Sequence, residues 1–309
     1  MRAVGIERTG GPEVLQIVDR DVRDPGPGEV RIAVRAAAVN PTDIGLRSNG
    51  GGDLPPPWTP GMDAAGTVES VGDGVDRLHP GEEVMAAVTP RRPDGGAQAE
   101  QIVVPEASVV SIPAGASLAQ AATLPMNGLT AKLGLELLGL TPGDTLAVTG
   151  GAGLLASYVI PLAKRAGLRV IADAKPEDDE LVRSFGTDVV VPRGDGYVDA
   201  VRDAERDGVD GLYDTALLHD AVFGAIRDGG TMVVVRGWEP EETERDIQVK
   251  QVFVAQALER TDWLEELRDL AGEGDLQLRV CGEYPPERAG EAQAAMDAGG
   301  VRGRYVITF

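Results

Sequence analysis

A chain of 309 residues can bury a large core and is long enough for two domains. With 42% hydrophobic and 26% charged residues its composition is that of a globular protein, and 50 acidic against 29 basic residues give a net charge of −21 at pH 7. A surface that binds the phosphate backbone of a nucleic acid needs an excess of positive charge. We therefore expect no nucleic-acid partner, although a local basic pocket is compatible with the net charge.

The single cysteine, Cys281, excludes an internal disulfide and a multi-cysteine zinc site, and it fits a reducing compartment. A lone cysteine can be a reactive thiol, but it is more often simply packed. The N-terminal segment carries charges where a signal peptide needs an apolar core, and no apolar run approaches the roughly 20 residues of a membrane span. We therefore expect a cytoplasmic protein.

Residues 1–117 are predicted to form a compact β-rich domain. The segment is rich in glycine and proline, and short strands at turn-punctuated spacing indicate such a domain. The strand-like runs are 29–39, 66–71, 82–88 and 100–105. The most loop-like segment, residues 49–61, is long enough to be a functional rim or lid.

Residues 118–255 alternate between helical and strand patterns. Helical apolar spacing surrounds Pro125 and recurs in 156–167 and 178–186, while short apolar runs at 145–150, 169–174, 188–192, 211–217 and 231–237 indicate strands. Repeated β-α units of this kind predict an α/β domain with a doubly wound parallel sheet. The tail, about 256–309, mixes helices and strands and resembles the first segment, so we expect it to complete the β-rich domain.

A glycine-rich turn joins the strand 145–150 to the helix that follows. It reads GGAGLLA, with Gly151, Gly153 and Ala156 in a GxGxxA pattern. Small residues let backbone N–H groups and a helix N-terminus approach a dinucleotide pyrophosphate. Glycine pairs also serve ordinary strand-to-helix turns, so the pattern alone leaves both interpretations open.

The chain resembles the zinc-independent quinone oxidoreductases of the medium-chain dehydrogenase/reductase superfamily. The resemblance spans nearly the whole sequence, in matching order and spacing. It is carried by AAAVNPTDIGLRS (36–48), PGMDAAGTVESVGDGV (60–75), HPGEEV (79–84), GGAQAEQIVVP (95–105), AATLPMNGLTA (121–131), LTPGDTLAVTGGAG (140–153) and VRGRYVITF (301–309). It implies a GroES-like β-rich catalytic domain split around a Rossmann dinucleotide-binding domain, with nicotinamide held in the cleft between them.

The resemblance also implies that the glycine turn is a pyrophosphate site. Its implied contacts are Gly150, Gly151, Gly153, Leu154 and Leu155. Leu154 and Ala156 stand where the family has glycines, and leucine narrows the room for a close backbone approach.

The end of the strand RVIADAK bears on the choice of cofactor. An acid at this point accepts from the ribose hydroxyls of NAD, whereas a small residue followed by a base accommodates the phosphate of NADP. With Ala174 at the acid position and Lys175 after it, the sequence favours NADP. Asp173 lies one residue earlier, so a register shifted by one would favour NAD instead.

Zinc-dependent members of the superfamily bind their metal through Cys, His and an acid. Where their GHE motif would lie, this chain has Gly61-Met62-Asp63, and a thioether is a poor zinc ligand. His79 and His219 lack partners at ligand spacing, and we interpret both as surface or structural residues. We therefore expect no metal.

Asn40 matches a family position that faces the nicotinamide, where its amide can donate to a developing oxyanion. It could equally form the turn before Pro41, and one residue can do both. Asp43 is expected to cap the following helical turn. The family often has tyrosines where Gly45 and Gln98 stand, so no obvious phenolic proton donor remains.

Four other residues match family contacts near the nicotinamide. Thr130 matches a contact to the cofactor, although its hydroxyl could instead cap a helical stretch. Val252, Phe253 and Val254 resemble a loop that lines the substrate cleft, but composition alone would make them core.

The sequence thus predicts an NADPH-dependent enzyme that transfers hydride to a quinone or an α,β-unsaturated carbonyl compound without zinc. The alternative is an NADPH-binding redox sensor or structural protein without turnover, which the altered glycine turn and the missing tyrosines keep open. We expect a small-molecule acceptor as the partner, no membrane association, and a homodimer.

Overall fold

A computed structural model describes residues 1–309, and the chain forms two compact units. The first unit comprises residues 1–126 and 255–309, and the second comprises residues 127–254. The predicted boundaries of the second domain are 118 and 255, whereas residues 118–126 lie in the first unit. No helix in the structure is long and apolar enough to cross a membrane.

The first unit is built on a seven-stranded sheet with the order β14-β15-β3-β4-β5-β7, in which β6 also pairs with β3. Strand β15 runs antiparallel to β3, with Val306 opposite Ala38, so the end of the chain extends the sheet of the N-terminal segment. The strands are β3 (Glu29–Ala38), β4 (Asp63–Val71), β5 (Glu83–Ala87), β6 (Gln101–Pro105), β7 (Val109–Ser111), β14 (Val280–Tyr284) and β15 (Arg304–Thr308).

A two-stranded sheet and short helices surround that sheet. The antiparallel pair is β1 (Arg2–Ile6) with β2 (Leu15–Asp19). The helices are α1 (Pro41–Asn49), α2 (Leu118–Ala121), α7 (Thr261–Glu273) and α8 (Ala289–Asp297), with 3₁₀ turns η1 (Pro12–Val14), η2 (Glu106–Ser108), η5 (Val254–Gln256) and η6 (Pro286–Arg288). α2 begins with a capping box, because Ser117 and Gln120 bond each other's backbone N–H groups.

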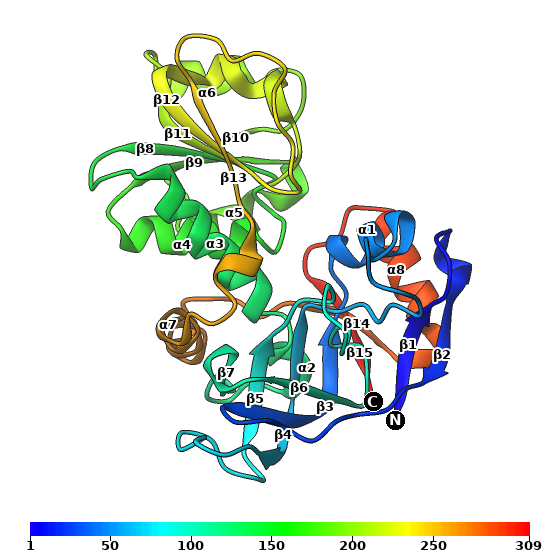
Figure 1. Cartoon of the computed structure of the whole chain (residues 1–309). Helices are drawn as coiled ribbons and strands as arrows, with labels where there is room; N and C mark the ends of the chain where they lie inside the picture. The colour runs from blue at the N-terminus through cyan, green and yellow to red at the C-terminus, as the bar shows by residue number, and fades with distance from the viewer. The chain divides into compact units, whose positions relative to one another are not determined.

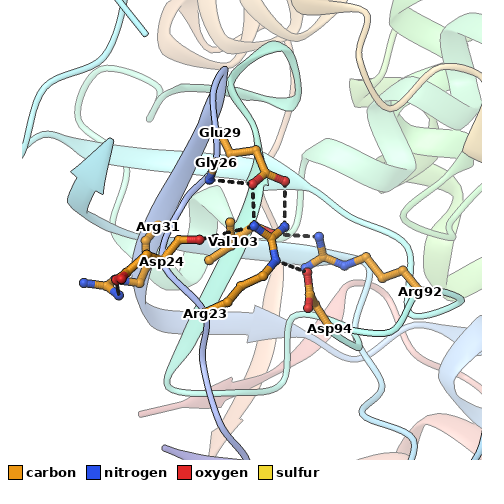
Figure 2. A network of polar contacts seen from close by, with 8 residues as sticks. All are labelled: Arg23, Asp24, Gly26, Glu29, Arg31, Arg92, Asp94 and Val103. Atoms are coloured by element: carbon orange, nitrogen blue, oxygen red, sulfur yellow. Dashed lines mark hydrogen bonds and ion pairs between the residues drawn. The ribbon is translucent and has the colours of Figure 1, made fainter. Parts of the chain in front are cut away.

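An ion-pair network fixes the segment that leads into β3 (Figure 2). The Arg23 guanidinium donates to both carboxylate oxygens of Glu29, at 2.5 and 2.6 Å, and its Nε–H donates to Asp94 at 3.0 Å. The Arg23 guanidinium lowers the pKa of Glu29 to about 2. Burial lowers the pKa of the neighbouring Arg92 to about 10, and that side chain donates to the Val103 carbonyl at 2.6 Å.

The second unit has a six-stranded, wholly parallel sheet in the order β10-β9-β8-β11-β12-β13. Two half-sheets that diverge from β8 and β11 give the doubly wound arrangement of dinucleotide-binding folds, which confirms the predicted fold class. The strands are β8 (Thr145–Thr149), β9 (Arg169–Ala174), β10 (Val189–Pro192), β11 (Val209–Asp214), β12 (Ile226–Val234) and β13 (Gln248–Gln251).

Helices cover both faces of this sheet, and Figure 1 shows α6 on one face with α4 and α5 on the other. All five residues of β8 are buried, as expected for a central strand covered on both faces. The helices are α3 (Pro125–Leu138), α4 (Ala156–Arg165), α5 (Asp179–Ser184) and α6 (Tyr197–Ala204), with 3₁₀ turns η3 (Pro176–Asp178) and η4 (His219–Ala225).

Two segments differ from the pattern read in the sequence. The helical region around Pro125 is two helices, because Pro125 lacks an N–H and begins α3 instead of lying inside one helix. β12 begins at Ile226, five residues before the run predicted as a strand, and residues 215–225, which include the 3₁₀ turn η4, separate it from β11.

Candidate functional site

The glycine turn lies at the carboxyl end of β8, at the point where the strand order of the second unit reverses. Gly150 has φ +68°, a conformation that strains residues with a side chain. A Cβ on Gly151 would lie 2.5 Å from the carbonyl oxygen of Asp173 in β9. Gly150 therefore makes the turn, and Gly151 permits the close approach of the turn to the neighbouring strand.

The two leucines of the turn directly precede helix α4, and Leu155 is its N-cap. Leu154 is only 2% exposed, so its side chain points into the unit and not onto the outer surface of the turn. The carbonyl groups of Gly153 and Leu155 already accept helical hydrogen bonds from Ser157 and Val159. The first N–H groups of a helix lack acceptors within the helix and suit a diphosphate, and the approach of a diphosphate past Leu154 stays a prediction.

Asp173 holds this turn in place. It is 2% exposed, and its carboxylate accepts the Gly151 N–H at 3.1 Å and lies 3.8 Å from Nε of Arg193. Burial raises the pKa of Asp173, while the Gly151 N–H and the Arg193 guanidinium oppose that rise. The contact with the turn is a role that the sequence did not assign, and a contact with a ribose stays a prediction.

Two cationic side chains follow the ends of β9 and β10. Lys175 is 53% exposed, with its Nζ 3.9 Å from Glu177. Arg193 is 44% exposed, and its backbone N–H donates to the Ala174 carbonyl at 3.0 Å, which brings it beside the end of β9. Sequence reasoning missed Arg193, although a base directly after the strand 188–192 was a usable signal.

The ends of β8 and β11 are joined by buried polar contacts that the sequence analysis also missed. Asp214 is fully buried and accepts from Thr149 Oγ1 at 2.6 Å and from the His219 N–H at 2.8 Å. The His219 ring stacks on Trp238, with centroids 4.5 Å apart and planes 4° apart. His219 therefore has a packing role here, and His79, in the other unit, is exposed.

The remaining residues expected near a nicotinamide in this unit differ in burial. Thr130 is 7% exposed in α3, and its carbonyl accepts from Tyr213 Oη at 2.7 Å. Val252 is 7% exposed, whereas Phe253 is 50% exposed. Composition alone would make 252–254 core, and this is wrong for Phe253, the one large hydrophobic side chain that is exposed in the structure. Contacts of Thr130 and of residues 252–254 with a cofactor stay predictions.

In the first unit, Asn40 is fully buried and forms the N-cap of α1. Asp43 accepts the Asn40 N–H at 2.8 Å through Oδ2 and the Gly61 N–H at 2.8 Å through Oδ1, so its carboxylate closes the start of the helix as expected. Pro41, at the first helical position, has the backbone that a helix start favours. The turn-forming role of Asn40 is therefore present, and its contact with an acceptor stays a prediction.

The Asn40 side chain belongs to a buried polar cluster, defined here as Asn40, Asp43, Asp63 and Arg304. Asn40 Nδ2 donates to Asp63 Oδ2 at 2.6 Å, and Arg304 Nε donates to Asn40 Oδ1 at 2.8 Å. Asp63 Oδ1 accepts the Met126 N–H at 2.5 Å. Sequence reasoning assigned nothing to Asp63 or Arg304, although an acid at the start of the apolar strand β4 was a signal.

Burial dominates the electrostatics of this cluster. It raises the pKa of Asp63 to about 7 and the pKa of Asp43 to about 6, against hydrogen bonds and the attraction of Arg304, which favour the ionised forms. Met62, beside Asp63, is buried. No group of three or more His, Cys, Asp or Glu side chains in the structure is placed to hold a metal ion.

Comparison with known families identifies two segments. A sequence model of the alcohol dehydrogenase GroES-like domain matches residues 26–114, and one described as zinc-binding dehydrogenase matches residues 185–307. The first match covers most of the strands of the β-rich unit. The second runs from the β9–β10 connection into β15.

Curated relatives carry related names. A trans-enoyl reductase of Aspergillus terreus is 32% identical over 66% of this chain and 73% of its own length. The quinone oxidoreductase of Rattus norvegicus is 28% identical over 99% of this chain and 97% of its own. The chloroplastic NADPH-dependent alkenal/one oxidoreductase of Arabidopsis thaliana is 35% identical over 74% of this chain, which spans 60% of that protein's length.

Solved structures share the fold over the whole chain. A mycobacterial protein complexed with NADPH superposes with a TM-score of 0.86 at 27% identity, covering 100% of both chains. An NAD-dependent alcohol dehydrogenase superposes with a TM-score of 0.85 at 29% identity, also covering 100% of both chains.

Proposed function

We propose that this chain reduces a quinone or an α,β-unsaturated carbonyl compound with NADPH, because it belongs to the quinone oxidoreductase family of the medium-chain dehydrogenase/reductase superfamily. The names of its relatives support a nicotinamide-dependent oxidoreductase in general. The preference for NADPH, the independence from zinc and the class of acceptor are the finer parts of the proposal.

One observation carries the proposal: the glycine turn at the carboxyl end of β8. The turn packs so closely on β9 at Gly151 that a residue with a Cβ would clash with it. The turn leads into the N-terminus of α4. These features fit a dinucleotide diphosphate. Gly150, Gly151 and Gly153 would let it approach the turn, and the backbone N–H groups of Leu154 and Leu155 would hold it.

Two basic side chains support NADPH over NADH. Lys175 and Arg193 follow adjacent strand ends, and the carboxylate of Asp173 is turned inward to the glycine turn. Because an acid that is buried against its own loop is poorly available to ribose hydroxyls, this arrangement suits a ribose 2′-phosphate better. A solved relative bound to NADPH agrees with this preference, and the NAD-dependent structure is the counterexample.

When bound, NADPH supplies the hydride that reduces the electron-poor carbon conjugated to the acceptor carbonyl. The residues of this chain bind and orient the two reactants and exclude water. We propose that the Asn40 amide donates a hydrogen bond to the acceptor oxygen, which gains negative charge during the reaction. Gln98, where relatives often have tyrosine, donates weakly to Asp43 at 3.3 Å, and we assign no proton donor to it.

We also propose that the reaction needs no zinc, since Met62 and Asp63 stand where zinc-dependent relatives have a His-Glu pair. Elemental analysis of protein purified without chelator should give well below one zinc per chain. Stoichiometric zinc that is lost together with activity would refute this part of the proposal.

The single cysteine supports a reducing, cytoplasmic compartment, we propose a homodimer by resemblance, and the net charge of −21 argues against nucleic acid as a partner. Light scattering coupled to gel filtration tests the dimer, and a monomer across the working concentration range would contradict it.

The activity is tested with a panel of quinones, enones and enoyl thioesters, each assayed with NADPH and with NADH. We expect steady NADPH oxidation with at least one acceptor class. NADPH binding without turnover on any acceptor would favour the non-catalytic alternative, a redox sensor or structural nucleotide-binding protein.

A further inference from the structure

The side-chain amide of Asn40 has two ends with opposite hydrogen-bonding character, and the cluster around it distinguishes them. Arg304 lies against one end, with its Nε 2.8 Å from Asn40 Oδ1. A guanidinium can only donate. The amide oxygen must therefore face Arg304, because the reversed amide would bring two donors together.

Asp63 lies against the other end. Its Oδ2 is 2.6 Å from Asn40 Nδ2, and its Oδ1 accepts the backbone N–H of Met126, which is also an obligate donor. The carboxylate thus accepts from two directions. Asn40 and Asp63 are fully buried and Arg304 is 9% exposed, so water cannot readily replace either contact.

We infer that Asp63 and Arg304 are positioning residues that lock the Asn40 amide in one of its two flipped orientations, so that its nitrogen remains a donor for the acceptor oxygen. This inference rests on the proposed function, in which Asn40 contacts that oxygen. Neither Asp63 nor Arg304 needs to touch a substrate, because each acts through the amide.

The charged groups around Asp63 give the lock a pH dependence. Asp43, from α1, is the second acid and repels the charge of Asp63, while Arg304, from β15, attracts it; Asn40 and the Met126 N–H, at the start of α3, are neutral donors. Asp63 has a pKa of about 7, so at acidic pH it carries a proton and loses the charge that strengthens both accepted hydrogen bonds. Arg304 still opposes the flipped amide, so protonation of Asp63 weakens the lock without removing it.

Asp63→Asn tests the lock, because it puts an uncharged amide of the same shape where the carboxylate accepts two N–H groups. Its NH₂ group must face a donor on one side or the other. We expect turnover of a quinone or enone to fall about tenfold above the pKa of Asp63. We expect NADPH affinity to stay within about twofold, since no nucleotide contact changes, and the pH dependence of turnover around that pKa to disappear.

Two variants of Arg304 compare a side chain that can only donate with one that can also accept. Arg304→Lys keeps an obligate donor against Asn40 Oδ1 and should retain most of the turnover. Arg304→Gln can present either oxygen or nitrogen, so it should release the amide and lower turnover as Asp63→Asn does. Equal losses in Arg304→Lys and Arg304→Gln would mean that Arg304 contributes packing and not orientation.

Asp43→Asn is the matched control within the same cluster. Asp43 is as buried as Asp63, but its carboxylate accepts backbone N–H groups and the Gln98 side chain, and not the side-chain amide of Asn40. We expect a lower thermal midpoint with the pH dependence preserved. The pH at the midpoint of the turnover profile should fall, because the charge of Asp43 raises the pKa of Asp63. Loss of the pH dependence in this variant would assign it to Asp43 and refute the role of Asp63.

Nuclear magnetic resonance of the Asn40 side-chain amide in ¹⁵N-labelled protein tests the orientation without turnover. The signal is assigned by its absence in Asn40→Ala. In the wild type we expect one pair of amide protons whose shifts follow the titration of Asp63; Asp63→Asn should abolish that titration, and Arg304→Gln should give a second pair.

Amide signals that respond neither to pH nor to Arg304→Gln would overturn the inference, even if Asp63→Asn fails to fold. A wild type that reduces no acceptor would refute the proposed function, and the same amide signals would still decide whether the lock exists.

Discussion

At the end of β9, the Lys175 ammonium is half exposed beside the cationic Arg193. A charge-assisted hydrogen bond to a phosphate contributes about 1 to 3 kcal/mol, and this contribution exists only with NADPH. Lys175→Glu should therefore raise the Michaelis constant for NADPH at least about fivefold and leave that for NADH nearly unchanged. Steady-state kinetics with both cofactors measures this. An equal rise in both Michaelis constants would show that Lys175 does not bind the ribose 2′-phosphate.

Asn40→Ala removes the amide and leaves Asp63 and Arg304 without the group that joins them. If the amide bonds the acceptor oxygen more strongly as charge develops, turnover should fall about tenfold while NADPH binds normally. Fluorescence titration measures NADPH binding, and circular dichroism checks the fold. Wild-type turnover in a folded variant would leave Asn40 only its role at the start of α1.

At the level of elements, the glycine turn and β9 must approach closely. Gly151→Ala would place a Cβ 2.5 Å from the Asp173 carbonyl oxygen, so the turn must move and its hydrogen bond to the Asp173 carboxylate must weaken. We expect a loss of about 1 to 3 kcal/mol in unfolding free energy, together with weaker NADPH binding.

Gly153→Ala is the control for this variant, because its Cβ would meet only the Gly150 carbonyl oxygen, at 3.1 Å. Denaturant unfolding of the two variants gives the comparison. A Gly151→Ala protein as stable as Gly153→Ala would mean that the turn can move away from β9 at no cost.

The strands and helices of the second unit could be predicted because their signals are local: short apolar runs, helical periodicity and glycine punctuation. The buried contacts could not. The pairing of Asn40 with Asp63 and Arg304 depends on strand register in the sheet of β3, β4 and β15, which no local pattern encodes. The inward turn of Asp173 likewise follows from the packing of a loop against a strand, so the sequence offered it only as a ribose contact.

For the whole molecule, the two buried acids predict how stability depends on pH. Their pKa values rise from 3.8 to about 6 for Asp43 and about 7 for Asp63, so the folded chain binds protons that the unfolded chain has released. The free energy of unfolding should therefore fall as pH rises toward 7. Each group contributes about 1.4 kcal/mol per pH unit between its pKa in the unfolded chain and its pKa in the folded chain.

Above its ordinary pKa of 4.5, Glu29 is ionised in both states, so its lowered pKa adds no slope in the same range. Denaturant unfolding at several pH values between 4.5 and 7 measures the effect. Asp63→Asn should remove about half of the slope of unfolding free energy against pH in the range where both acids contribute to it. A wild-type stability that is flat or rises across this range would show that these acids are not buried as described.

The most direct measurement of the central claim follows NADPH oxidation and acceptor reduction together, in one reaction with the wild-type protein and a panel of quinones and enones. We predict that NADPH disappears in equal amount to the reduced acceptor formed, and faster than NADH does at the same concentration. NADPH that binds but is never oxidised with any acceptor would contradict the assignment of this chain as a reductase.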